Sequence, residues 1–347
     1  MSTPLYVSMG NAKIDDSVAL FDLPVVTTCP GAGECIKYCY AMKQEWWGEG
    51  RPILRRRVEN LKETFKTTFA DDMVALIKAN RIKVCRPHDS GDFFDQNYVN
   101  QWRRIARRCP ETTFYCYTKS LHLDLGALSR LPNVTLIRSF GGKYDSRIKT
   151  RRDDYARVDE VSQKTIQPGE YVCPEVRTSG KKTEKYCAYN CTYCLSSRDT
   201  RRTRRHQVRV VFRKSMGGWT GTRLAPRPPG YMIRPVPAIP TQTQKPGGPA
   251  KSASRAPNMK GGASKGGEAR PTSDAETARL VEAELAYRHL LLAGFSRETI
   301  VQRTGLKDLS ELRSGHALQL IQQKAAEEET VKRKPELKPL RQTRKRK

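Results

Sequence analysis

Three cysteines lie close together in the run CPGAGECIKYCYA, at the spacing C-x5-C-x3-C: Cys29, Cys35 and Cys39. The proline and glycines between the first two favour a turn. Three thiolates can hold a [4Fe-4S] cluster and leave one iron open for a substrate or cofactor, provided that the loop is wide enough to surround the cluster. The spacing therefore predicts an iron-sulfur site in this loop.

A zinc knuckle is the alternative for the same three thiols. Structural zinc takes four ligands in a tetrahedral arrangement, so the loop would need one more ligand, such as His88. Spacing alone leaves both interpretations open.

A second cysteine group follows the spacing C-x13-C-x3-C-x2-C: Cys173, Cys187, Cys191 and Cys194. Four thiolates form a closed coordination set, which fits zinc and a second [4Fe-4S] cluster equally well. Unliganded cysteine is usually buried, and this segment is polar, so we expect a metal here as well.

Helical and strand patterns alternate between the two cysteine groups. Apolar residues recur at helical spacing over 53–79 and 96–108, and apolar or aromatic runs at 82–85, 112–120 and 134–140 are typical of buried strands. Strands that alternate with helices through short connections pair in parallel. The sequence therefore predicts an α/β domain, and we expect a partial or complete (β/α) barrel.

Polar residues follow the predicted strands, where α/β barrels place their sites. Ser90, Gly91 and Asp92 form a turn after the strand at 82–85. His88 and Lys119 stand at the carboxyl ends of two predicted strands and are our candidates for catalytic residues.

Several of these motifs together resemble known families. The aromatic residue directly before the third cysteine, Tyr38, in a loop that follows the apolar run LPVV and precedes a helix, resembles the radical S-adenosylmethionine enzymes. Their usual spacing is C-x3-C-x2-C, so this loop is longer. CPGAGECIKYCYA, HDSGDF and FYCYTKS in this order resemble the gene product 88 family of phages and plasmids, over about residues 20 to 200.

The resemblance implies a cofactor and a binding turn. S-adenosylmethionine would bind the open iron, and Ser90, Gly91 and Asp92 would contact its methionine end. Asp92 would accept a hydrogen bond from the cofactor ammonium group and contribute to cofactor binding rather than to folding.

The formal net charge is +28, with 64 Lys and Arg against 36 Asp and Glu. Residues 201–214 contain no acid, and residues 331–347 contain nine bases and one acid. Clustered bases are natural counterions for phosphate, so we expect contact with DNA or RNA through these segments.

Helical patterns return near the C-terminus. Ser273 begins a capping pattern with Glu276, and a further helix runs from Ser296 to Gly305. The helix after Gly305 could complete a helix-turn-helix that presents Arg313 and Gln319. A helical hairpin used for homodimerisation is the alternative.

We expect a cytoplasmic protein without membrane contact. The first twenty residues do not have the pattern of a secretory signal, and no apolar stretch is long enough to span a bilayer. In a reducing compartment the ten cysteines favour metal over disulfides.

Four parts are expected along the chain: a radical-SAM-like α/β domain that contains the four-cysteine segment 173–194, a basic disordered linker rich in Pro and Gly, a helical module and a basic tail. They cover residues 1–200, 201–272, 273–330 and 331–347.

Two function classes remain open from the sequence. One is an iron-sulfur enzyme of radical S-adenosylmethionine type from a phage, plasmid or other mobile element, whose basic segments help to hold a large substrate. The other is a non-enzymatic DNA- or RNA-binding protein with structural zinc sites.

Overall fold

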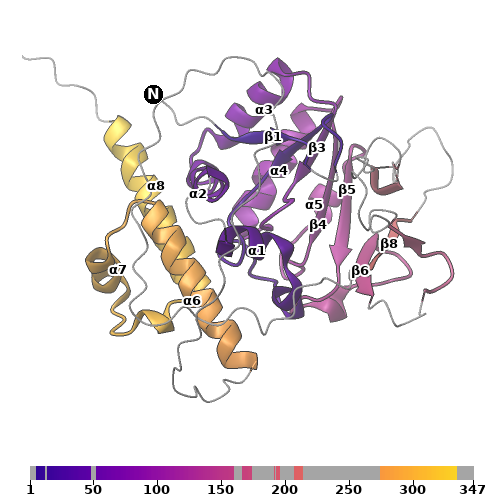
Figure 1. The fold of residues 1–347 in the computed structure, drawn as a ribbon. Helices are drawn as coiled ribbons and strands as arrows, with labels where there is room; N and C mark the ends of the chain where they lie inside the picture. Colours follow the sequence, from indigo (N-terminus) through magenta and orange to yellow (C-terminus); the bar gives the residue numbers. More distant parts are fainter. Residues whose placement is uncertain are drawn as a thin grey trace, which may run out of the picture.

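The computed structural model describes an α/β core and a C-terminal group of helices (Figure 1). The described residues are 5–11, 14–47, 52–159, 166–173, 191, 193–195, 207–213 and 274–333.

One sheet organises the N-terminal part, in the strand order β1-β2-β3-β4-β5-β6-β8-β7. The strands are β1 (Val7–Met9), β2 (Val18–Phe21), β3 (Val84–Pro87), β4 (Thr113–Thr118), β5 (Val134–Ser139), β6 (Tyr155–Asp159), β7 (Tyr171–Val172) and β8 (Arg209–Arg213). β1 pairs with β2 in antiparallel fashion, and all other neighbours are parallel. The predicted α/β class with parallel pairing is therefore confirmed.

From β2 to β6 the strands lie side by side in chain order, as in a (β/α) barrel rather than in a doubly wound sheet. Among the described strands no pairing joins β1 to β7, so the barrel itself stays a prediction.

Most connections between strands contain helices or short helical turns. These elements are η1 (Glu34–Tyr38), α1 (Tyr40–Trp47), α2 (Pro52–Thr64), α3 (Phe69–Ala79), α4 (Gln96–Arg108), α5 (Gly126–Ser129), η2 (Asp145–Arg147) and η4 (Tyr193–Leu195). The helical pattern over 53–79 is interrupted, because residues 65–68 turn between α2 and α3 through bonds such as Phe65 N to Lys62 O. α4 has the predicted bounds, and the Asp95 carboxylate caps it by accepting from Tyr98 N at 2.7 Å.

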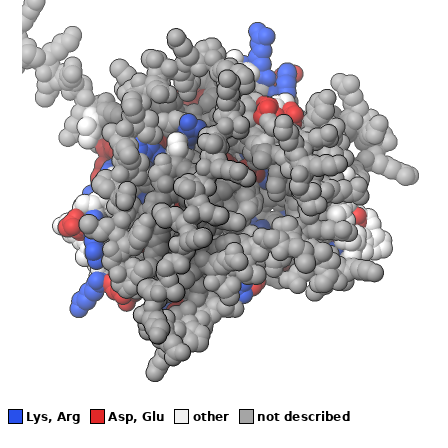
Figure 2. Space-filling view, in the orientation of Figure 1, with Lys and Arg blue, Asp and Glu red and all other residues white. Residues whose placement is uncertain are grey.

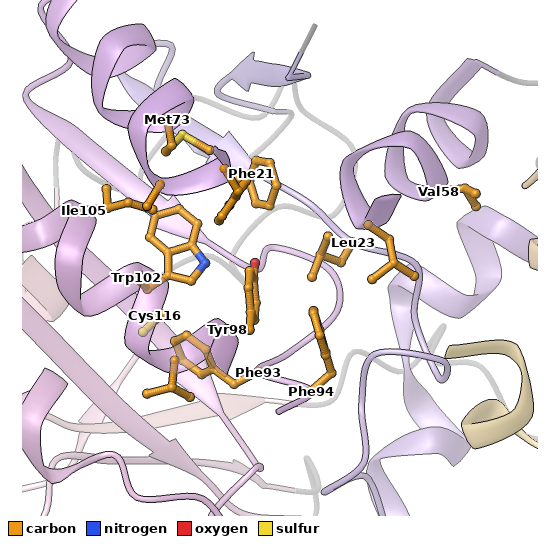
Figure 3. Packing of buried hydrophobic residues seen from close by; sticks show 14 of the residues in the cluster. Phe21, Leu23, Val58, Met73, Phe93, Phe94, Tyr98, Trp102, Ile105 and Cys116 are labelled. Atoms are coloured by element: carbon orange, nitrogen blue, oxygen red, sulfur yellow. The ribbon is translucent and has the colours of Figure 1, made fainter. Parts of the chain in front are cut away.

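The largest core cluster lies between the sheet and these helices (Figure 3). Phe21 from β2, Phe69 from α3 and Trp102 from α4 pack together as an aromatic group. Along β4, Phe114 and Cys116 face this cluster, whereas Tyr115 belongs to a separate cluster on the other face of the sheet. The sheet therefore has one face covered by helices and an opposite face on which buried side chains form a separate cluster.

The disordered linker was predicted to begin at residue 201, but the folded α/β part continues beyond this residue. Arg209–Arg213, inside the predicted 201–272 segment, form β8 and pair with both β6 and β7. Val210 and Val211 are buried. The apolar residues of this strand are flanked by arginines, so basic composition concealed a buried strand. Gln207 and Val208 directly precede this strand, and the remainder of the predicted linker lies outside the described residues.

The C-terminal helices share the core of the α/β part. They are α6 (Asp274–Leu292), α7 (Arg297–Thr304), η6 (Leu309–Glu311) and α8 (Ser314–Arg333). α6 and α8 run side by side next to α2 (Figure 1), and Ala286, Leu290 and Ile321 belong to the largest core cluster. These apolar residues are thus buried within the chain, and homodimerisation through the C-terminal helices stays a prediction.

Two predicted helix signals at the C-terminus are confirmed. Ser296 Oγ accepts from Thr299 N at the start of α7, and Gly305 ends α7 at a φ of 69°. The second helix of the predicted helix-turn-helix begins at Ser314, so Arg313 precedes it instead of lying on it, while Gln319 is exposed on α8.

The described surface carries both signs of charge. On the face shown in Figure 2, the described residues include blue Lys and Arg side chains and red Asp and Glu side chains, some of which lie next to each other. None of the described helices is both long and apolar enough to cross a membrane.

Candidate functional site

The first cysteine loop begins after β2, at the carboxyl end of the parallel strands. The apolar run LPVV that precedes it is a turn instead of a strand, with Val26 at a φ of 65°. This left-handed conformation is uncommon for a β-branched residue. Buried contacts hold it, because Val25 and Val26 both pack in a core cluster with α1.

The loop after β5 lies directly on the cysteine loop. Cys35 N donates to Gly141 O at 2.9 Å, Lys143 N donates to Gly31 O at 2.9 Å, and Ala32 forms an isolated bridge with Gly142. These bonds attach the cysteine loop by its backbone to the end of a strand that lies more than a hundred residues further along the chain.

Close backbone approach explains the glycines of both loops. A Cβ on Gly31 would lie 2.1 Å from Lys119 O, and a Cβ on Gly141 would lie 2.3 Å from the Tyr38 hydroxyl. The Asp145 carboxylate accepts from the N–H groups of Gly141 and Gly142 at 2.8 and 2.9 Å. Sequence analysis missed this loop. A Gly-Gly pair after a predicted strand, with an aspartate three residues on, is the signal that could have found it.

The three thiols of the first group lie near enough to influence one another's pKa. Burial raises the pKa of Cys29 well above its ordinary value, and the charges of Asp92, Cys39 and Cys35 raise it further. Burial likewise raises the pKa of Cys39 to about 11. For Cys35, burial raises the pKa, and the Lys119 ammonium group acts in the opposite direction. Thiolates at this site therefore need a positive partner.

Among the described residues, no three His, Cys, Asp or Glu side chains converge as ligands of a single metal ion. Both the cluster and the zinc assignment of this loop stay predictions.

Asp92 ties the turn after β3 to the end of β4. Its Oδ1 accepts from Thr118 Oγ1 at 2.6 Å and from its neighbour Phe93 N at 2.7 Å, and its Oδ2 accepts from Lys119 N at 2.8 Å. Burial raises its pKa, while the bonds from Thr118 and Lys119 lower it. These bonds give the carboxylate a structural role, so its expected independence of folding does not fit this geometry, whereas the cofactor contact stays a prediction.

Ser90 and Gly91 pack against the chain that leads to the cysteine loop. Ser90 Oγ donates to Leu23 O at 2.6 Å. Gly91 has a φ of 82°, and a Cβ there would lie 2.7 Å from both Leu23 Cβ and Thr28 Oγ1. The predicted turn is therefore present and is adjacent to the start of the cysteine loop.

The two candidate catalytic residues lie in different surroundings. His88 is buried against Phe93 and Trp102, its Nε2 lies 3.0 Å from the Tyr98 hydroxyl, and burial lowers its pKa to about 3. It is a neutral side chain of the aromatic core. Lys119 donates through Nζ to Ser139 Oγ at 2.6 Å, and its charge acts on Cys35. Of the two, Lys119 is the one that the fold brings to the cysteine loop.

The second cysteine group lies against the sheet face opposite to the helices. The Tyr117 hydroxyl donates to Cys194 Sγ at 3.0 Å, and the Tyr171 hydroxyl lies 3.7 Å from Cys191 Sγ. Cys173 and Cys194 pack on the same apolar cluster. The fourth predicted ligand, Cys187, lies outside the described residues.

These features define an α/β protein with a cysteine loop at the carboxyl ends of its parallel strands. The Gene product 88 family model matches residues 5–215, which include the eight strands of the described residues and both cysteine groups, and the chain belongs to this family. The predicted family is thereby confirmed.

Two curated relatives come from phages. The Gene 88 protein of Mycobacterium phage L5 is 33% identical over 102 residues, which cover 26% of this chain and 43% of that protein. The Gene 88 protein of Mycobacterium phage D29 is 30% identical over 138 residues, which cover 33% of this chain and 58% of that protein. The chain thus spans about half the length of these relatives. No solved structure matches the chain.

Proposed function

We propose that the first cysteine loop binds a [4Fe-4S] cluster through Cys29, Cys35 and Cys39, and that the protein is an enzyme of radical S-adenosylmethionine type. The observation that carries this proposal is the position of the three thiols. They interact with one another at the carboxyl ends of parallel strands that run in chain order, which is the end where barrel enzymes place their sites.

The chemistry of these residues fits an iron-sulfur cluster. Thiolates are soft ligands, and burial opposes their formation in the absence of a metal. The loop also receives backbone support on two sides, from the Gly141–Gly142 turn and from the strand end at Lys119. Such support matters because a metal site depends on the groups that orient its ligands.

The bound cluster would supply one-electron chemistry and an iron that is free to bind a cofactor such as S-adenosylmethionine. The protein's own residues have other roles. Lys119 would balance part of the negative charge near Cys35, and Asp92 would fix the turn at Ser90 and Gly91 against the end of β4. Zinc or a second [4Fe-4S] cluster at Cys173, Cys187, Cys191 and Cys194 is proposed on their spacing alone.

The excess of basic residues supports a second candidate function, that of a DNA- or RNA-binding protein whose cysteines hold structural zinc. Bases cluster in 201–214, which contains no acid, and in 331–347, which contains nine bases and one acid. Deleting 331–347 should weaken binding to all duplex sequences alike and flatten the dependence on salt, since basic tails act through released counterions. An unchanged salt slope would remove the tail from nucleic-acid binding.

Metal analysis of anaerobically purified protein decides between the two functions. We expect brown protein with iron and acid-labile sulfide, and Cys35→Ala should lose the iron of the first site. Cys109→Ala is the matched control, because Cys109 is buried near the amino-terminal end of β4. Colourless protein that contains zinc at both cysteine groups would contradict the iron-sulfur proposal.

A further inference from the structure

The C-terminal helix α6 packs on both ends of the first cysteine loop. One apolar cluster joins Val25 and Val26, before the loop, to Ala41 and Met42, after it, and to two residues of α6: Val281 and Leu285. Ile36 and Cys39, from the loop itself, pack against the same cluster. A segment more than two hundred residues away in the chain thus covers this side of the site.

A fully buried histidine adds polar contacts to this packing. His289 Nε2 donates to Glu45 Oε2 at 3.0 Å, and its Nδ1 lies 2.7 Å from Thr27 Oγ1. Thr27 stands two residues before Cys29, and Glu45 stands six residues after Cys39. A single imidazole therefore connects the chain that enters the cysteine loop with the helix that leaves it.

The network continues from Glu45 into the α/β core. Glu45 Oε1 accepts from Val25 N at 3.1 Å and from Arg57 Nη1 at 2.9 Å. Glu45, His289 and Arg57 are almost completely shielded from solvent. Buried polar groups of this kind are costly to leave without partners, so removal of the imidazole would disturb the whole set.

α6 lies beyond the region that the family model matches, which ends at residue 215. The cysteine loop belongs to the matched region, but part of its support does not. In this chain, the site is therefore assembled from two separate parts of the sequence.

We propose that α6 completes the cysteine site and that His289 is a positioning residue, which holds the two ends of the cysteine loop in place through Thr27 and Glu45. The effect on metal binding rests on the proposed function. The effect on the loop does not, because it can be measured on the thiols of metal-free protein.

The test compares variants of the full chain by the alkylation rates of Cys29, Cys35 and Cys39, read by mass spectrometry on metal-free protein. His289→Ala should raise these rates about tenfold or more, because local opening of the loop becomes easier. His289→Gln should recover part of the protection, since its amide can still donate to Glu45. His316→Ala is the control, because the His316 side chain bonds to Arg313 N within the C-terminal helices.

Thr27→Val provides a second route if His289→Ala fails to fold. It keeps the shape of the side chain and removes only the contact with Nδ1, and it should raise the alkylation rates by a smaller factor. Folded His289→Ala and Thr27→Val proteins with wild-type rates at all three cysteines would overturn the proposal.

Iron content then separates the two proposals. If the wild-type protein binds iron, His289→Ala should bind less of it and give a broadened EPR signal, whereas His316→Ala should match the wild type. Wild-type protein without iron would overturn the proposed function, and the alkylation rates would still decide the role of His289.

Discussion

The two cysteine groups are similar in sequence but receive different support from the fold. The first group lies at the carboxyl ends of the strands, where its loop is bonded to the β5 loop and packed against α6. The second lies against the opposite face of the sheet from the helices, where two of its thiols contact tyrosine hydroxyl groups.

β4 connects the two regions. Tyr117, near its end, contacts Cys194, while Lys119, two residues further on, acts on Cys35. Cysteines more than 130 residues apart in the chain thus approach the same strand end. The comparison teaches that two clusters of cysteines in one sequence can receive different structural support, so the surroundings of the thiols must be measured for each group separately.

The largest expected effect is loss of one metal site without the other. Cys35→Ala should empty the first site and leave the metal of the second, and Cys194→Ala should do the reverse, because the two groups lie on different elements. Metal content of both variants checks this. If either single change empties both sites, the groups form one composite site and the comparison fails.

Gly31→Ala should damage the first region through its backbone contacts. The new Cβ would lie 2.1 Å from Lys119 O and 2.9 Å from Ser120 Cα, both of which are backbone atoms. We expect a loss of about 3 kcal/mol in the free energy of unfolding, measured by urea denaturation. Gly315→Ala, where nothing lies within 4 Å, should instead be neutral or slightly stabilising. Equal results for the two variants would contradict the close approach at Gly31.

Asp92→Asn should lower the free energy of unfolding by about 2 kcal/mol, because an amide cannot accept on both sides. The NH2 group of the asparagine would face either the Thr118 hydroxyl or the Lys119 N–H, each of which now donates to a carboxylate oxygen of Asp92. Asp124→Asn is the control, since the exposed Asp124 side chain accepts from Gly126 N through Oδ1 at 2.9 Å, a bond that an amide oxygen can also accept. A normal melting curve for Asp92→Asn would return Asp92 to the purely cofactor-binding role that the sequence predicts.

A smaller effect concerns pH. Burial and the nearby Asp89 raise the pKa of Asp22 from 3.8 to about 6. Asp22 therefore binds a proton more readily in the folded protein than in the unfolded chain. Above a pH of about 6 its ionised carboxylate destabilises the folded state, and this destabilisation disappears as the pH falls and the carboxylate is protonated. As the pH falls from about 7 to about 5, the free energy of unfolding of the wild type should rise by about 1 kcal/mol relative to that of Asp22→Asn, measured by urea denaturation at each pH. A stability difference that does not change over this range would contradict the raised pKa of the partly buried Asp22.

Local signals predicted the fold well where they were strong. Helical spacing gave α4 its bounds, and the serine and glycine signals located the ends of α7, because caps and periodicity act over a few residues. β8 was missed because arginines surround its apolar residues, and the order of β7 and β8 in the sheet has no local signal.

The candidate site was predictable in part for the same reason. Cysteine spacing and the turn at Ser90 and Asp92 are local patterns, whereas the contacts of His289 and of the Gly141 loop join segments far apart in the chain. The burial of His88 among aromatic rings also had no local signal, because a strand-end position does not reveal which face of the sheet a side chain takes.

EPR spectroscopy of reduced, anaerobically purified protein, before and after addition of S-adenosylmethionine, tests the central claim most directly. The proposed site predicts a [4Fe-4S] signal that changes shape when S-adenosylmethionine is added, that persists in Cys109→Ala and whose response to S-adenosylmethionine is lost in Cys35→Ala. A protein that gives no iron-sulfur signal and contains zinc bound at Cys29, Cys35 and Cys39 would contradict it.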